Sequence, residues 1–255
     1  MGSLTQNLEH LEAGIEQACR RAGRPRREVE LMAVSKTYPS ATIVEAAALG
    51  MRLFGENRVQ EFAGKAHDLA ALAAAGSVAA PEPGIRVHLI GHLQSNKSAR
   101  AAELFDGVDS LDSLRLAERL NEAAGRLRKR LPVLLEVKLS PEDTKSGVEP
   151  DSADAAQMLE GLPGLDHLDV QGLMTIAPWG VADEITRACF RSLRELRDRW
   201  AAAHPCLNLN VLSMGMSGDF GIAIEEGATR IRIGTALFGP RKKPGTEQAP
   251  QASSA

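Results

Sequence analysis

The chain has 255 residues, of which 44% are apolar and 25% are charged, and its formal net charge is −3. These values are typical of a globular protein with one large domain or two small ones. So small a net charge excludes the strong positive field that would indicate a nucleic acid or an anionic membrane as the partner.

The cysteine count and the amino terminus indicate the cellular compartment. Cys19, Cys189 and Cys206 are an odd number without a CxxC pair, so reduced thiols are expected rather than disulfides or a metal site. The first twelve residues contain acids where a signal peptide needs an apolar core, and no apolar run approaches the ~20 residues of a membrane span. We therefore expect a soluble cytoplasmic protein without metal, nucleic acid or membrane partners.

The hydrophobic periodicity predicts a helix over residues 4–22, ended by Gly23 and Pro25. Eight apolar runs then alternate with helical patterns. The predicted strands are residues 29–35, 52–55, 87–91, 107–111, 132–139, 168–174, 210–213 and 229–233. The helical patterns lie at about 40–49, from 56 onward, from 92 onward, and at about 113–131, 152–159, 183–203 and 214–227.

Eight strand–helix units in about 240 residues predict a single (β/α)8 TIM barrel over residues 1–239, with an extra helix at the amino terminus. An open doubly wound sheet is the alternative, but it would usually carry a GxGxxG turn after the first strand, and the sequence has none there. Residues 240–255 are polar and rich in proline, so they are expected to form a disordered tail.

In a barrel of this class the chemistry lies at the carboxyl ends of the strands. The candidate residues that this rule selects are Lys36, Asn57, His88, Lys138, Met174, the segment 213–219 and the residues after Ile233.

Lys36 ends the first predicted strand, where partial desolvation would favour a neutral amine that forms an imine with a carbonyl. The alternative is a lysine whose ammonium simply reaches solvent. At the last strand, Gly234 and Thr235 open a short helix, and their N–H groups are suited to bind an anion. The loops after strands seven and eight are the usual phosphate site of such barrels, although both could also be ordinary tight turns.

A ligand with both an aldehyde and a phosphate would satisfy the lysine and the anion site together. Pyridoxal 5′-phosphate (PLP) is such a ligand. A sugar phosphate bound by a lysine-dependent aldolase is the other candidate.

The sequence resembles one family over about residues 31–239. The motifs that carry the resemblance are AVSKTYP, FGENRVQE, HLIGHLQSNK, VLLEVKLSPEDTKSG, QGLMTIAP, LSMGMSGDF and RIRIGTALFG, in this order. They are similar to the successive motifs of the pyridoxal phosphate homeostasis protein family, a single-domain relative of the alanine racemase barrel.

The resemblance implies a role for each matching residue. Lys36 would carry PLP as an internal aldimine, and Arg232 would face the pyridine nitrogen. Phosphate would be bound by the turn at Gly234 and Thr235 and by the hydroxyl of Ser217. The other cofactor-binding positions that it implies are Asn57, His88, Met174 and Ser213. The sequence departs from the family pattern at Val87, where an aromatic residue is usual, and at Lys138, where asparagine is usual.

An arginine beside the pyridine nitrogen favours a cofactor carrier over an enzyme. Arginine does not give up a proton at neutral pH, so the ring stays a weak electron sink. In the alanine racemases a tyrosine from an added β-domain supplies the second base, whereas the one tyrosine here is Tyr38, two residues after Lys36. We therefore expect a non-enzymatic PLP-binding homeostasis protein, with PLP-dependent apo-enzymes as possible recipients. A monomer is expected, and a weak amino-acid racemase is the alternative.

Three further polar segments have less specific interpretations. Glu56 and Glu61 flank a helix start and are interpreted as surface or helix-dipole charges. Ser113 is predicted to cap the helix that follows it. The segment 145–147, Lys-Ser-Gly, could contact a ligand or form a turn.

Overall fold

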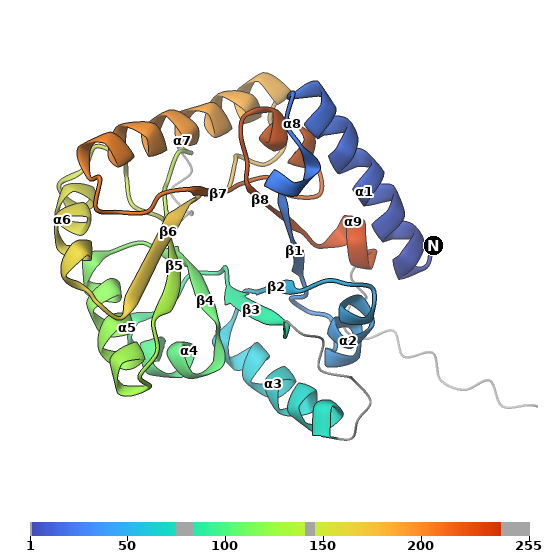
Figure 1. The fold of residues 1–255 in the computed structure, drawn as a ribbon, viewed down its shortest axis with the longest axis horizontal. Helices are drawn as coiled ribbons and strands as arrows, with labels where there is room; N and C mark the ends of the chain where they lie inside the picture. The colour runs from blue at the N-terminus through green and yellow to red at the C-terminus, as the bar shows by residue number, and fades with distance from the viewer. Residues whose placement is uncertain (1, 75–83, 141–145, 241–255) are drawn as a thin grey trace, which may run out of the picture.

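The structure is a computed structural model that describes residues 2–74, 84–140 and 146–240. Eight parallel strands pair in chain order and close into a barrel through β8 and β1, and the helices lie outside them (Figure 1). The strands are β1 (Glu30–Val34), β2 (Leu53–Glu56), β3 (Arg86–Leu89), β4 (Gly107–Leu111), β5 (Leu131–Glu136), β6 (Leu168–Met174), β7 (Val211–Ser213) and β8 (Arg230–Ile233). The predicted (β/α)8 barrel is confirmed. The predicted tail from residue 241 onward lies outside the described residues.

The helices that connect these strands follow the predicted order. They are α1 (Leu4–Arg21), α2 (Ser40–Ala48), α3 (Val59–Ala74), α4 (Ser98–Leu104), α5 (Leu114–Arg126), α6 (Ala153–Gly161), α7 (Asp183–Ala203), α8 (Phe220–Glu225) and α9 (Thr235–Phe238), with short 3-10 turns at Arg26–Glu28, Ser95–Lys97 and Leu162–Gly164. Ser113 is the N-cap residue of α5, as predicted, but its hydroxyl donates to Asp112 and makes no hydrogen bond with the helix amides.

The predicted extra helix, α1, covers part of the outside of the barrel. Ser3 caps it by accepting from the N–H of Gln6, and its buried face includes Leu11, Ile15 and Ala18. This face packs against α8 and α9, so the amino-terminal helix lies over the end of the chain's last strand–helix units (Figure 1).

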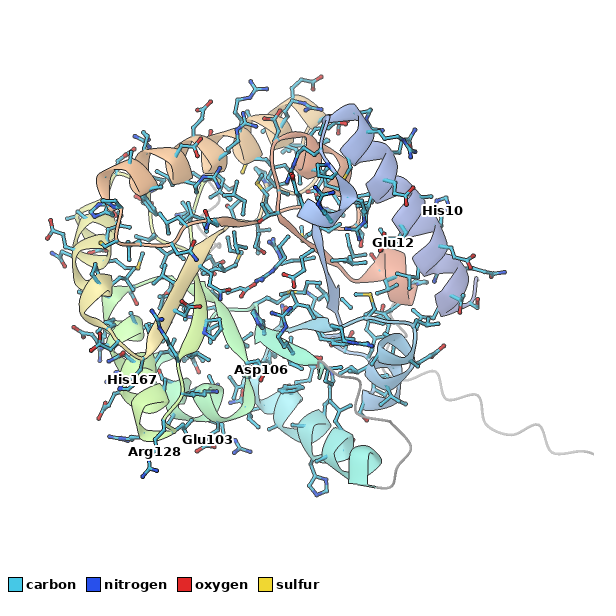
Figure 2. The ribbon with its side chains drawn as sticks, in the orientation of Figure 1. His10, Glu12, Glu103, Asp106, Arg128 and His167 are labelled. Atoms are coloured by element: carbon cyan, nitrogen blue, oxygen red, sulfur yellow. The ribbon has the colours of Figure 1, made fainter. Side chains whose placement is uncertain are left out.

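Alternation along the strands separates two layers of side chains. Leu31, Ala33 and Ile231 belong to the large apolar layer between barrel and helices. The barrel interior is different: it holds a small apolar cluster, to which Met32 belongs, and buried charges such as Arg230. Figure 2 shows side chains filling the space inside the ring of strands, whereas the labelled His10 and Arg128 lie at the periphery.

None of the described helices combines the length and apolar character that crossing a membrane requires. Within the same residues, no cluster of three or more histidines, cysteines or acids is arranged to hold a metal ion. The thiols of Cys19 and Cys189 are buried, and that of Cys206 is exposed.

Candidate functional site

One cavity of about 480 Å³ lies at the carboxyl ends of the strands. This volume is in the range of pockets that hold a small ligand. Its walls come from the ends of β1, β2, β3, β6, β7 and β8 and the loops that follow them. Six of the predicted site residues line it: Lys36, Asn57, Ser217, Arg232, Gly234 and Thr235.

Lys36 lies in a tight turn directly after β1. The N–H of Tyr38 donates to the carbonyl of Ser35 at 3.1 Å, so Lys36 and Thr37 are the two central residues of the turn. Thr37 has a φ of 69°, a left-handed conformation that is costly for a β-branched residue. Such a conformation persists where the surroundings hold it in place.

A buried acid that the sequence does not reveal lies beside this turn. Glu56, the last residue of β2, was predicted as a surface or helix-dipole charge, but its side chain is completely buried, so that prediction is wrong. It accepts hydrogen bonds from the hydroxyl of Ser35 at 2.7 Å and from Nζ of Lys65 at 2.8 Å. A parallel strand as short as β2 shows too little alternation in the sequence to reveal a buried acid.

Arg232 brings a buried positive charge to the cavity from β8. Its guanidinium donates to the hydroxyl of Ser213 at 2.9 Å and to the carbonyl of Thr175 at 2.8 Å. Burial lowers the pKa of Arg232. The negative charges of Asp109 and Glu136 act in the opposite direction but do not outweigh burial. A guanidinium carries more N–H groups than these two bonds use, so Arg232 can also donate to a ligand that enters the cavity.

Another part of the cavity wall is made of small residues and backbone amides. Thr235 is the first residue of α9, so its N–H has no acceptor within the helix. The hydroxyl of Ser217 accepts from the N–H of Ala236 at 3.2 Å, which places it beside the same helix end. Together with Gly218 and Gly234, these groups form a wall that can donate hydrogen bonds to an anion.

Three of the predicted cofactor-binding residues do not line this cavity. Ser213 is buried and accepts a hydrogen bond from the lining residue Arg232, and Met174 is completely buried at the end of β6. His88 is also buried, with Nδ1 at 2.8 Å from Oδ1 of Asp109. Gly107 makes room for its ring, because a Cβ there would lie 2.5 Å from the imidazole. Asp109 in turn accepts from Arg230 at 3.0 Å, so His88 belongs to a charged network within the barrel.

Some lining residues after β6 are not among the predicted candidates, whereas those after β7 belong to the predicted segment 213–219. Ile176 and Trp179 follow β6, and Met216 and Gly218 follow β7. Trp179 lines the cavity although 86% of its surface is exposed, so it lies at the rim. Their common signal is position: each follows the carboxyl end of a strand, as the barrel rule requires.

Of the two remaining lysine candidates, only Lys138 belongs to the described residues. Nζ of Lys138 lies 3.6 Å from the carboxylate of Glu149, and Lys138 does not line the cavity. Lys145 lies outside the described residues. A larger and more open depression of about 800 Å³ is lined by residues between Arg197 and Asn210, before β7, and contains none of the predicted site residues.

Residues 6–242 match the family model described as the alanine racemase N-terminal domain. The chain is also 43% identical to the pyridoxal phosphate homeostasis protein of Vibrio cholerae over 243 residues, which cover 94% of this chain and 98% of that protein. The chain belongs to the pyridoxal phosphate homeostasis protein family.

Solved structures agree with this family and place it in a wider fold group. PipY of Synechococcus elongatus, in a structure with PLP bound, is 41% identical, with a TM-score of 0.79 over 93% of this chain and all of that one. An alanine racemase of Clostridium difficile shares 17% identity and a TM-score of 0.67, and the alignment covers 94% of this chain but 57% of the racemase. The likeness to the racemase concerns the fold alone.

Proposed function

We propose that this protein binds PLP through an imine to Lys36 and serves PLP homeostasis without turning over a substrate. One observation carries the proposal: a single cavity joins a lysine at one strand end, a buried arginine, and a wall of amides and a hydroxyl suited to phosphate. The PLP-bound structure of PipY, at 41% identity over the whole of that chain, supports it.

In this proposal each part of the cavity has one task. Ser217 and the N–H of Thr235 hold the phosphate, because they are the donors at the start of α9. Lys36 supplies the amine that reacts with the aldehyde, and Asn57 lines the same wall. Bound PLP supplies the aldehyde and, when its ring nitrogen is protonated, a strong electron sink.

The residues beside the cofactor argue against rapid turnover. Arg232 stays charged and has no proton to give to the ring nitrogen at neutral pH, so the sink stays weak. The one tyrosine of the chain, Tyr38, donates its hydroxyl to the carbonyl of Gly239 at 2.6 Å, so it is engaged away from any substrate. This pairing removes the nearest candidate for a second base.

The first test is a visible absorption spectrum of the purified protein with and without added PLP. We expect an imine band that disappears on borohydride reduction, with mass spectrometry placing the adduct on Lys36. Lys36→Ala should lose the band, whereas the matched Lys138→Ala should keep it, because Lys138 does not line the cavity. The absence of a band in excess PLP would contradict the proposal; trapping of a sugar phosphate by borohydride in a colourless protein would then favour an aldolase.

A second measurement separates the carrier from the weak racemase that the shared barrel suggests. The protein should not racemise or transaminate a panel of amino acids at ordinary enzymatic rates. Robust exchange of the Cα proton that Lys36→Ala abolishes would instead establish the racemase. Two further expectations stay predictions: light scattering should report a monomer, and apo-enzymes mixed with the loaded protein should gain activity.

A further inference from the structure

The turn that carries Lys36 is tied to a second, buried lysine on α3. We propose that Lys65 is a positioning residue, which holds the backbone on both sides of Lys36 so that its amine stays directed at the cavity. This inference rests on the proposed function, since it concerns the reaction of Lys36 with an aldehyde.

The first tie is on the amino-terminal side of Lys36. Nζ of Lys65 donates to the carbonyl of Ser35, the residue just before Lys36, at 2.9 Å. The same carbonyl closes the turn by accepting from Tyr38 at 3.1 Å. Lys65 is 9% exposed, so water competes little for this bond.

The second tie is on the carboxyl-terminal side. The N–H of Thr37 donates to Oε1 of Glu61 at 2.5 Å, and the same oxygen lies 3.0 Å from Nζ of Lys65. Glu61 and Lys65 are one helical turn apart on α3, so they meet on one face. This pair secures Thr37 in its left-handed conformation, which the chain would otherwise leave.

Glu56 completes the arrangement by balancing the charge of Lys65. One carboxylate oxygen, Oε1, accepts from both Lys65 and Ser35. A lysine that served packing or charge balance alone would need only this partner. Here Lys65 also reaches the backbone carbonyl that precedes Lys36 and the acid that binds the N–H after it, so its contacts converge on the turn.

Two steps of cofactor binding, the binding of the phosphate and the formation of the imine, should therefore depend on different parts of the site. The phosphate contacts come from the loops after β7 and β8, which Lys65 does not touch. The encounter of the amine with the aldehyde depends on the β1 turn. Losing Lys65 should therefore slow imine formation and leave the binding of the phosphate and ring unchanged.

The experiment compares two ligands on matched variants. Lys65→Met removes the first tie and the cation that supports Glu61 in the second, but it also leaves Glu56 unpaired, so the charge-matched double variant Glu56→Gln/Lys65→Met is made as well. Stopped-flow absorbance measures the rate of imine formation with PLP. Calorimetry measures the affinity for pyridoxine 5′-phosphate, which has an alcohol where PLP has the aldehyde. Lys129→Met is the control, because Lys129 donates to the carbonyl of Phe105 at 2.9 Å, before β4.

We expect imine formation in the double variant to be roughly ten- to a hundredfold slower, because a displacement of about 1 Å can cost this much in rate. Its affinity for pyridoxine 5′-phosphate should change less than about twofold, and Lys129→Met should change neither quantity. Equal losses with both ligands, or an unchanged imine rate, would overturn the inference. Absence of an imine band in the parent protein would instead contradict the proposed function itself.

Discussion

Two pairs of glutamates in this molecule have opposite electrostatic environments. The mouth carboxylates, Glu56 and Glu136, end β2 and β5 and are buried. Each has one oxygen, Oε2, without a hydrogen-bond partner among the described residues. Burial raises the pKa of both, against the hydrogen bonds from Lys65 and Ser35 to Glu56 and from Ser146 to Glu136.

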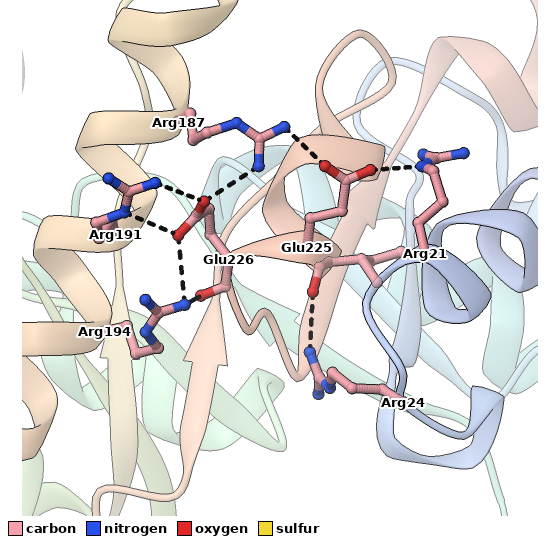
Figure 3. Close-up of polar contacts among 8 residues, drawn as sticks. Arg21, Arg24, Arg187, Arg191, Arg194, Glu225 and Glu226 are labelled. Carbon is pink, nitrogen blue, oxygen red and sulfur yellow. Dashed lines mark hydrogen bonds and ion pairs between the residues drawn. The ribbon is translucent and has the colours of Figure 1, made fainter.

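The outer carboxylates, Glu225 and Glu226, lie at the end of α8 among arginines of α1 and α7 (Figure 3). Hydrogen bonds from Arg187 and Arg21 lower the pKa of Glu225. Burial alone would raise the pKa of Glu226, but its bonds with Arg191 and Arg187 outweigh burial and lower it. These contacts join three helices outside the barrel.

The comparison teaches that the same side chain can stabilise the fold or cost it stability. An acid whose pKa falls on folding contributes stability when it is ionised, whereas an acid whose pKa rises opposes folding in its ionised form. The costly acids lie at the carboxyl ends of the barrel strands, the end that also holds the candidate site. Side chains that lower the stability of the fold are common at binding sites, where their positions suit a ligand rather than the fold.

The largest expected effect comes from breaking the Lys65–Glu56 pair. Lys65→Met should lower the free energy of unfolding by about 3–5 kcal/mol, because it leaves a buried carboxylate without its cation. The double variant Glu56→Gln/Lys65→Met should lose far less, because no fully buried carboxylate is left without its cation, and Glu61, which also loses Lys65, is partly exposed. Urea unfolding measures both, and equal losses would show that Lys65 stabilises through packing rather than charge.

A smaller loss is expected among the outer carboxylates. Glu226→Gln should cost about 1 kcal/mol near neutral pH, because its contacts with arginine are partly screened by solvent. The pKa of Glu226 is lowered from 4.5, so the parent's advantage is full above 4.5 and is lost as the pH falls through the lower, folded-state value. Unfolding curves at a series of pH values check this, and PLP binding should not change. An undiminished loss in acid would argue against the ionic contribution.

The smallest effect should have the opposite sign. Glu136→Gln should raise the free energy of unfolding near neutral pH by about 1 kcal/mol or less, because it removes an ionised group whose burial is incompletely compensated. The pKa of Glu136 is raised from 4.5, so the gain should disappear as the pH falls through the folded-state value toward 4.5. The exposed Glu149 provides the control variant Glu149→Gln, which should change little. A loss of stability in Glu136→Gln would show that the attraction of Arg232 outweighs burial.

The prediction from sequence succeeded where periodicity and position carry the signal. The predicted strand at 168–174 and the predicted helix at 183–203 agree with β6 and α7 to the residue. Lys36 was selected by its place after an apolar run, and it does line the cavity. Both inferences depend only on local pattern and on the rule that barrel loops meet at one end.

The sequence was less informative about which polar side chains face the cavity and which face each other. His88 and Ser213 are predicted as site residues from their position at strand ends and from the resemblance, yet they bond to Asp109 and Arg232 inside the barrel. The prediction of Glu56 as a surface or helix-dipole charge is wrong, and its partner Lys65 is not among the predicted site residues. A strand of three or four residues shows too few alternations to say which of its side chains point inward.

The sequence by itself thus determined the architecture, the strand order and the segments that meet at the carboxyl end, because hydrophobic periodicity and chain connectivity are local properties. The tertiary structure alone decided which polar groups are partners. Glu56 and Lys65 meet the Lys36 turn because β1 pairs with β2 and α3 follows β2, and Arg230 reaches Asp109 from β8 across the interior to β4. Burial then sets their energetics, because a charge removed from water depends on the few partners that remain within reach.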